Sequence, residues 1–268
     1  MFRNLLRIRY HIPRLEQIVL GFVPILTILL LWFFSTLGEA EVRWVSPTIL
    51  PSPIEVIRSF PSLWFQSELS RSVILSFTRV ITGFLVSLSV AFPLGILMGS
   101  FTRVRALFDS LATFGAYLPI PALVPLTMSI FGIGELQKIM FLALAFFVYL
   151  LPLFVKAVDE VDNVYLQTAY SLGARKWQVV RHILLGISFP QLYHAIRLGF
   201  GIGWTYIIIA EMVAADRGLG YIITIAQRRG PREHIYLVLV VIVVIAFVTD
   251  RILVKLGEIL FPYQEQKS

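Results

Sequence analysis

The chain has 268 residues, of which 57% are hydrophobic and only 15% are charged, and its mean hydropathy is +0.82. A soluble domain of this length is about half apolar and a quarter charged, so this composition excludes a soluble protein and indicates an integral membrane protein. The absence of cysteine excludes disulfides and thiolate metal sites, and the net charge of +7 is typical of cytoplasmic membrane flanks without implying nucleic acid.

Six apolar segments are long enough to cross a bilayer as helices, which takes about 20 residues each. They lie at about residues 17–37, 72–99, 110–130, 139–155, 189–213 and 235–254. Long helical runs without an alternating strand pattern exclude a β-barrel. The sequence therefore predicts an all-α membrane protein with six transmembrane helices.

The basic residues predict the orientation of these spans. Arginines crowd residues 1–16, which places this N-terminal segment in the cytoplasm, and an even number of spans places the tail, residues 258–268, there as well. The first apolar stretch is longer than that of a signal peptide, so we expect it to remain as a helix. One set of residues between the last two spans runs against this orientation: Arg217, Arg228, Arg229 and Arg232.

The segment 38–70 is expected on the periplasmic side. Its prolines resist a continuous helix and favour extended turns, and residues 54–65 are expected to form a short amphipathic helix at the membrane surface. Residues 71–257 then form the core of the protein, with one polar cytoplasmic loop at 157–188.

Three prolines interrupt the third span within the string YLPIPALVPL: Pro119, Pro121 and Pro125. Each removes a backbone hydrogen-bond donor, and a broken span is tolerated where the backbone faces protein or a water-filled cavity. The prolines indicate either a hinged helix that lines a pathway or a kink that fits neighbouring helices.

Glycines spaced four residues apart let helix backbones approach closely. Gly95 and Gly99 form one such pair, and Gly199 and Gly203 form another. We expect these glycines to pack helices within the chain or, alternatively, to contact a second copy of it.

Arg79 and Glu211 are ionisable residues inside otherwise apolar spans. An unpaired charge at the middle of a bilayer costs at least about 2.5–3.5 kcal/mol, so we expect the two to pair across helices or to face a polar pathway. An ion pair that only fixes the register of the helices is the alternative explanation.

The segment 165–190, YLQTAYSLGARKWQVVRHILLGISFP, is polar and basic between long apolar runs, which excludes it as a membrane span. Acidic residues lie just before this segment and basic residues lie in its second half, an order that suits a helix macrodipole. The central Gly173 favours a helix–turn–helix. A structured loop on one side of a membrane protein indicates a contact with a soluble partner.

This loop resembles the coupling segment of ABC importer permeases of the binding-protein-dependent, type I fold. The family pattern has Glu-Ala-Ala, three further residues and then a glycine. Here Gln167-Thr168-Ala169 stands for the triplet and Gly173 for the glycine. Two positions depart from the pattern, because Gln167 replaces the glutamate and Gly186 replaces a proline.

The likeness extends over about residues 50–256, where LPSPIEVI, SFTRVITGF, FGIGELQK and GLGYII follow in the family's order. These strings are similar to the branch that imports nitrate, taurine, sulfonates or bicarbonate. The resemblance implies a bacterial inner-membrane permease subunit that opens a pathway by alternating access, and not an enzyme. The chain lacks a GxxxxGK[ST] phosphate loop, so ATP and magnesium would be used by a separate ATPase chain.

The resemblance also implies the partners and their sites. The partners would be a second permease chain in a homodimer, cytoplasmic ABC ATPase subunits and a periplasmic solute-binding protein. Pathway candidates are Arg79, Glu211 and the three prolines, with no cofactor, catalytic group or metal held by this chain. The ATPase contact would fall on Tyr165, Gln167, Thr168, Ala169, Leu172, Gly173, Ala174, Arg175 and Lys176.

Two other classes remain as alternatives: an ion-coupled secondary transporter and a membrane scaffold that recruits a soluble partner. A secondary transporter would usually show paired intramembrane acids and an internal repeat, and neither is evident. The substrate stays open. The basic outer loop and Arg79 suit a small anion such as nitrate, bicarbonate or a sulfonate, and an uncharged precursor is the other possibility.

Overall fold

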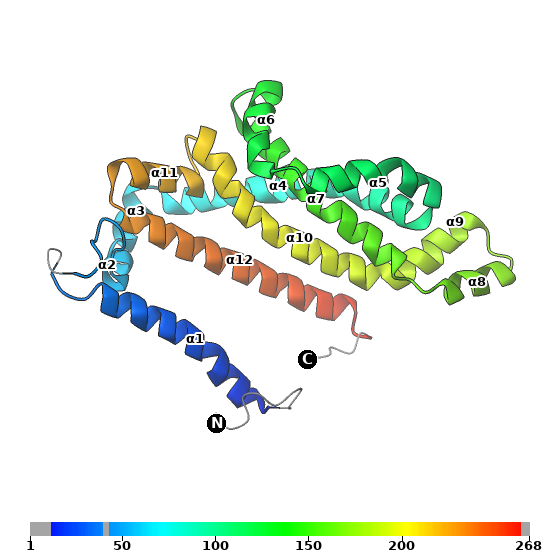
Figure 1. Cartoon of the computed structure of the whole chain (residues 1–268), viewed down its shortest axis with the longest axis horizontal. Helices are drawn as coiled ribbons and strands as arrows, with labels where there is room; N and C mark the ends of the chain where they lie inside the picture. Colours follow the sequence, from blue (N-terminus) through cyan, green and yellow to red (C-terminus); the bar gives the residue numbers. More distant parts are fainter. Residues whose placement is uncertain (1–11, 40–42, 264–268) are drawn as a thin grey trace.

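The computed structural model describes residues 12–39 and 43–263, and the regular secondary structure in these ranges is entirely helical (Figure 1). Within the described residues five helices are long and apolar enough to cross a membrane, or six if one bent pair of helices counts as a single span, in agreement with the predicted all-α membrane fold. The arginines before Arg14 and the end of the tail lie outside the described residues. The long helices are α1 (Arg14–Ser35), α4 (Leu69–Ser100), α7 (Glu135–Asp159), α10 (Leu185–Ala214) and α12 (Glu233–Leu260).

The third predicted span is broken at its prolines. Helix α5 (Thr102–Ala116) ends, the short turn η2 (Ile120–Ala122) follows, and α6 (Leu123–Phe131) leaves at 89° to α5. Pro119 precedes the turn and Pro121 lies within it, where a missing N–H ends the backbone hydrogen bonding of α5. Figure 1 shows α6 standing out from the long axis of the bundle.

Helix α7 is the central helix of the bundle, with α4 and α10 packed along it. Its large side chains Phe141, Phe146, Leu150 and Phe154 are almost fully buried. Lipid tails are as apolar as these side chains, so close packing between helices, and not removal from water, holds this part of the protein together.

Glycines let α4 and α10 approach α7. A methyl group added to Gly95 would lie 2.5 Å from Cβ of Phe154, which leaves no room for a side chain. A methyl group added to Gly99 would lie 2.6 Å from the nearest side-chain atom of α7, and one added to Gly199 or to Gly203 would lie 2.3 Å from such an atom. All four glycines therefore serve packing within the chain, and these positions are not open to a second copy.

Helix α1 diverges from the bundle towards its N-terminal end (Figure 1). None of its side chains is buried. Near its other end Trp32 Nε1 donates to the carbonyl of Pro51 at 2.9 Å, and its ring lies 6.1 Å from that of Tyr236. The apolar sides of α1 suit direct contact with lipid or with another membrane helix.

Three short helices gather where α1 ends and α12 begins. The expected helix over residues 54–65 is in fact two helices that divide at Ser59. Ser52 caps the first of them: its Oγ accepts from the Glu55 N–H at 3.3 Å, and its N–H donates to Glu55 Oε2 at 2.8 Å. The three helices are α2 (Pro53–Arg58), α3 (Phe60–Gln66) and α11 (Leu219–Arg229).

The arginines that run against the predicted orientation have local roles at this outer end. Arg228 and Arg229 lie in the last turn of α11, where positive charge favours the helix dipole. Arg232 donates to the carbonyl of Thr48 and so ties the proline-rich segment to the start of α12.

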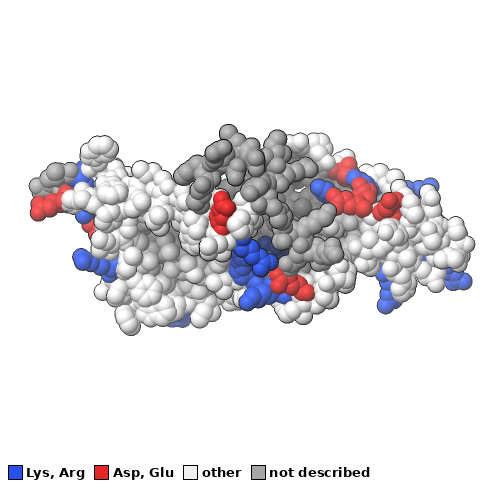
Figure 2. All heavy atoms as spheres, turned by 90° about the horizontal axis from the view of Figure 1, so that it is seen from below, with Lys and Arg blue, Asp and Glu red and all other residues white. Residues whose placement is uncertain are grey.

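The opposite end of the bundle carries α8 (Asn163–Ser171), and α1 begins and α12 ends towards that side (Figure 1). Figure 2 shows the molecule from below, with charged side chains gathered in separate groups between wide uncharged stretches. Such an uncharged surface is what a protein presents to lipid.

Candidate functional site

Helix α8 ends in a tight turn at Gly173. The Gly173 N–H donates to the carbonyl of Tyr170 at 2.9 Å, and the Ala174 N–H donates to that of Ala169 at 3.0 Å. These two bonds are the Schellman pattern of helix ends, which requires a left-handed residue. Gly173 has φ +82° and open space around its Cα, so backbone conformation alone explains the glycine.

The surface around this turn is apolar and exposed. Leu172 at the tip is 83% exposed, and Tyr165 and Trp177 are more than half exposed. A groove of about 710 Å³ lies beside the turn, lined in part by Tyr165, Thr168 and His182. Exposed apolar patches with polar neighbours mark protein contacts, so this surface is suited to bind another protein.

The turn brings together every residue predicted for the ATPase contact. Ala169 is buried against the bundle, and Ala174 is half-buried. The others are exposed on α8 or just after the turn: Tyr165, Gln167, Thr168, Leu172, Gly173, Arg175 and Lys176.

The turn is anchored to the bundle on both sides. Leu166 of α8 packs against the buried core. After the turn, the Trp177 ring meets the Phe101 ring, at the junction of α4 and α5, with a centroid distance of 5.5 Å. The exposed tip is therefore held by packed side chains and is not a free loop.

The fifth span begins earlier than the predicted residue 189. A helix starts at Lys176, passes through the π-helical stretch η3 (Val179–Leu184) and continues as α10, so that one rod runs from Lys176 to Val213. The helix therefore extends into the segment predicted as the cytoplasmic loop, and the bounds 157–188 of that loop stay a prediction. Hydropathy placed the start too late because the first turns of this helix are polar.

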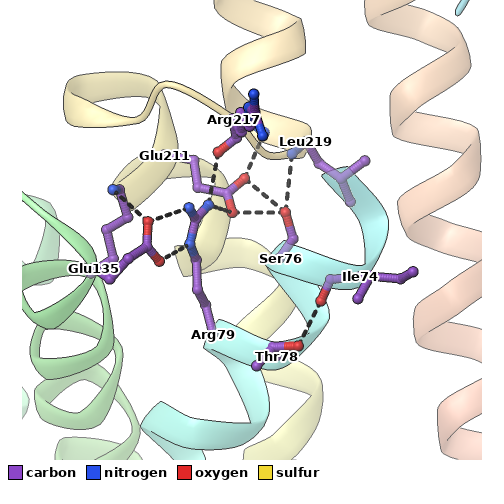
Figure 3. A network of polar contacts seen from close by, with 10 residues as sticks. Ile74, Ser76, Thr78, Arg79, Glu135, Glu211, Arg217 and Leu219 are labelled. Atoms are coloured by element: carbon purple, nitrogen blue, oxygen red, sulfur yellow. Dashed lines mark hydrogen bonds and ion pairs between the residues drawn. The ribbon is translucent and has the colours of Figure 1, made fainter. Parts of the chain in front are cut away.

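A network of charges joins α4, α7 and α10 close to the N-terminal end of α7 (Figure 3). Arg79 Nη1 donates to Glu211 Oε1 at 2.7 Å, which confirms the predicted pairing across helices. Arg79 Nε donates to Oε2 of Glu135, the first residue of α7, at 2.6 Å. Nη1 also donates to the carbonyl of Arg217, and Lys138 Nζ donates to Glu135 Oε1 at 3.2 Å.

Glu211 is completely enclosed, with 0% of its side chain exposed. Ser76 Oγ donates to its carboxylate at 2.7 Å, and the Gly220 N–H donates to Oε2 at 2.9 Å. A methyl group on Gly218 would lie 2.5 Å from this carboxylate, so glycine is required there. In this conformation neither Glu211 nor Arg79 is accessible to a solute.

Five members of this network were not identified from the sequence as site residues. They lie in strings that mark the family resemblance, but a single polar residue near a span end carries no periodicity signal. The position of Glu135 at the outer end of a span, level with Arg79, is the signal that points to it. The five are Ser76, Glu135, Lys138, Gly218 and Gly220.

The three prolines lie apart from the charge network. Pro119, Pro121 and Pro125 are exposed on η2 and α6 or beside them. Their role in a pathway remains a prediction.

The chain is similar to known membrane transport components. Residues 91–257 match the family model described as binding-protein-dependent transport system inner membrane component. The chain is 29% identical to the taurine transport system permease protein TauC of Escherichia coli, over 91% of this chain and 89% of that protein. It is 30% identical to a probable ABC transporter permease protein of Brucella abortus, over 88% of this chain and 91% of that protein.

A third relative is the putative aliphatic sulfonates transport permease protein SsuC of Bacillus subtilis, which is 28% identical over 77% of this chain and 75% of that protein. Among solved structures, a chain of the inward-facing MetNI methionine ABC transporter superposes with a TM-score of 0.66. The two chains are 19% identical over 74% of this chain and 97% of that one, so this likeness concerns the fold.

Proposed function

The chain belongs to the family of binding-protein-dependent transport system inner membrane components, and we propose that it couples a separate ATPase to substrate import through the turn at Gly173. As an ABC transporter permease it is a multi-pass transport subunit of the inner membrane and not an enzyme. The proposal concerns how this permease receives the force of ATP binding and which solute it moves.

One observation carries the coupling proposal. The exposed turn is joined to a helical rod that extends from Lys176 to Val213 and bears Glu211 near its far end. A displacement of Leu172 is transmitted along this helix to the charge network at Arg79. At 1.5 Å per residue an α-helix of this length spans about 55 Å, enough to cross a membrane from surface to surface.

We propose three partners for this permease. An ABC ATPase binds the apolar surface around Leu172 and Tyr165, and a second permease chain completes the pathway, as a homodimer. A solute-binding protein meets the outer end formed by α2, α3 and α11. ATP binding closes the ATPase pair, and the turn carries that motion into the spans.

Substitutions at Gly173 test the coupling. Gly173→Asn keeps a residue that tolerates the left-handed region, whereas Gly173→Val is β-branched and unfavourable there by about 1–2 kcal/mol or more. We expect the valine variant to copurify with the ATPase but to lose uptake in proteoliposomes, and the asparagine variant to retain most of it. If the Gly173→Val variant takes up substrate at the wild-type rate, the Gly173 turn does not couple the ATPase to import.

The substrate that we propose is a small organic sulfonate. Two relatives that cover most of the chain are named for taurine and for aliphatic sulfonates. A riboflavin transport system permease protein of Chloroflexus aurantiacus is also similar, at 26% identity, so a neutral aromatic solute is the competing class.

The cognate binding protein decides between these classes. We expect taurine or short alkanesulfonates to raise its thermal unfolding temperature, and riboflavin, nitrate and bicarbonate to leave it unchanged. If only neutral compounds stabilise that protein, the sulfonate assignment is wrong. The coupling proposal is tested separately, by the Gly173 variants.

A further inference from the structure

The exposed surfaces of the spans are of two kinds. The exposed side chains of α12 between residues 239 and 248 are all valine, leucine or phenylalanine, as expected next to lipid. On α4 the exposed Thr78 is also compatible with lipid, because its hydroxyl donates to the carbonyl of Ile74 in the same helix at 2.8 Å (Figure 3).

The exposed face of α10 is different. Between residues 190 and 206 it carries His194, Leu198, Gly201 and Thr205 at helical spacing, so that in this middle stretch a single exposed aliphatic side chain stands among polar residues and glycine. A face of this composition is not one that a helix turns towards hydrocarbon.

Two tyrosines border this face. Tyr206 of α10 and Tyr149 of α7 meet through their hydroxyls at 2.9 Å, on the exposed side of the bundle. Their rings lie 6.1 Å apart, and Tyr149 is 38% exposed. A tyrosine hydroxyl does not reach the backbone of its own helix as Thr78 does, so these two polar groups point out of the chain.

The tyrosine pair lies at membrane depth. Tyr149 is fourteen residues from Glu135 and ten from Asp159, the two ends of α7. At 1.5 Å per residue it lies about 20 Å from the outer end and about 15 Å from the inner end, within a hydrocarbon layer of about 30 Å. Tyrosines that anchor a span at the membrane surface lie at its ends and not at this depth.

We propose that the face formed by Leu198, Gly201, Thr205 and the Tyr149–Tyr206 pair lines the water-filled passage, and that the free O–H of this pair donates to a sulfonate oxygen of a passing solute. This assignment rests on the proposed sulfonate class. In the hydroxyl pair one O–H donates to the other tyrosine, and the second O–H proton remains available for an anionic oxygen.

The chemistry of the pair suits a transient site. Arg79 is held by Glu211 and Glu135 and is not available to the solute. Neutral hydroxyls bind an anion more weakly than a guanidinium does, and a pathway must release its solute as readily as it accepts it. Gly201 beside them leaves the passage wide at this level.

The absence of cysteine in this chain makes a direct test possible. Thr205 is exposed on the face of α10 that we assign to the passage, so Thr205→Cys places a thiol there. Val244→Cys is the matched control, because Val244 is exposed on the face of α12 assigned to lipid. In membrane vesicles that hold the complete transporter, both are treated with 2-sulfonatoethyl methanethiosulfonate. This reagent is water-soluble and itself an alkanesulfonate, and it forms a mixed disulfide with release of methanesulfinate.

We expect Thr205→Cys to react about 100-fold faster than Val244→Cys, because a charged group pays about 2.5–3.5 kcal/mol to enter lipid. Taurine at high concentration should slow the reaction of Thr205→Cys. Equal, slow labelling of both positions overturns the proposal. Labelling that taurine does not slow overturns the sulfonate site.

Tyrosine variants give a second readout. Tyr149→Phe/Tyr206→Phe keeps both rings, and Tyr193→Phe is the matched control on α10, where the hydroxyl donates to the carbonyl of Leu253. We expect the double variant to lower the maximal rate of taurine uptake about tenfold, which corresponds to the loss of one hydrogen bond to a charged group. Its ATPase activity and thermal stability should stay within the range of the control.

A double variant with unchanged taurine uptake would refute the role of the hydroxyls. If the wild-type transporter itself does not move taurine, the proposed substrate class fails, whereas the thiol labelling of Thr205→Cys still decides whether this face lines the passage.

Discussion

The Arg79 guanidinium on α4 and the Glu211 carboxylate on α10 are joined at 2.7 Å, and both side chains are almost fully excluded from solvent. Arg79 also holds Glu135 at the start of α7, so one side chain ties three spans together. A charge buried this way stabilises only as long as its partners are present. The pair therefore fixes the relative positions of the spans at the outer end.

Removal of one partner is expected to destabilise the protein strongly. Glu211→Gln leaves the Arg79 charge without its most buried partner, at a cost of about 3–5 kcal/mol in unfolding free energy. Arg79→Gln/Glu211→Gln should recover part of that loss, because no unpaired charge remains at the site. Unfolding temperatures of the purified variants in detergent measure both effects. A double variant no more stable than Glu211→Gln would contradict this account.

Glu135 is expected to contribute less to the stability of the protein than Glu211 does. Its side chain is 58% exposed, against 0% for Glu211, so water replaces much of what the ion pair supplies. We expect Glu135→Gln to lower the unfolding temperature by clearly less than Glu211→Gln in the same assay, and equal losses would show that the two contacts are equivalent.

Gly220 is expected to tolerate no side chain. A methyl group there would lie 2.7 Å from both Glu211 Cβ and the carbonyl oxygen of Ile208, and a backbone oxygen has no other place to move. Gly220→Ala should therefore cost about 1–3 kcal/mol through overpacking. Gly134→Ala is the control, because that glycine has open space around it. Equal yields of folded protein for the two variants would contradict the close contact.

The glycine of α4 at position 95 should affect folding and not association. Gly95→Ala places a methyl group 2.5 Å from Cβ of Phe154, which lies too close to the backbone of α7 to rotate away. We expect a lower unfolding temperature with an unchanged oligomeric state, as measured by light scattering in detergent. A dissociated but equally stable protein would instead support a contact between copies at this position.

The ion pair of Arg43 with Glu55 predicts an acid-dependent loss of stability in the outer segment. The hydrogen bonds from Arg43 lower the pKa of Glu55 from 4.5 to about 2. The stabilisation is therefore complete above the unfolded pKa near 4.5 and is lost as pH falls towards 2. The difference in unfolding temperature between wild type and Glu55→Gln should shrink across this range, and a constant difference would show that the carboxylate charge is not involved.

The features that could be predicted from the sequence are those that depend on the chemistry of one or two unusual residues. A lone arginine and a lone glutamate in apolar spans were expected to pair or to face a polar pathway, and they pair. Prolines at 119 and 121 had to break a span, and they do so at an angle of 89° that no sequence pattern contains. The left-handed turn at Gly173 was likewise evident, because a glycine between a helical segment and a basic one is typical of a helix end.

Other features depend on contacts between distant residues and carry no such signal. Tyr149 and Tyr206 are 57 residues apart, and each alone resembles an ordinary membrane tyrosine. The early start of the fifth span was missed for another reason. Polar residues between Lys176 and His182 lower the hydropathy of this stretch, but they do not prevent the helix from beginning at Lys176.

The π-helical stretch Val179–Leu184 has a consequence for the phase of the rod that it interrupts. A π-turn holds one residue more than an α-turn, so the segment amounts to a single inserted residue between the turn at Gly173 and the face of α10. If the same residues formed a regular α-helix, the turn at Gly173 would be rotated by about 100° around the rod and would lie about 1.5 Å further from the face of α10. The direction in which the Gly173 turn faces relative to the exposed face of α10 is thus set by one residue.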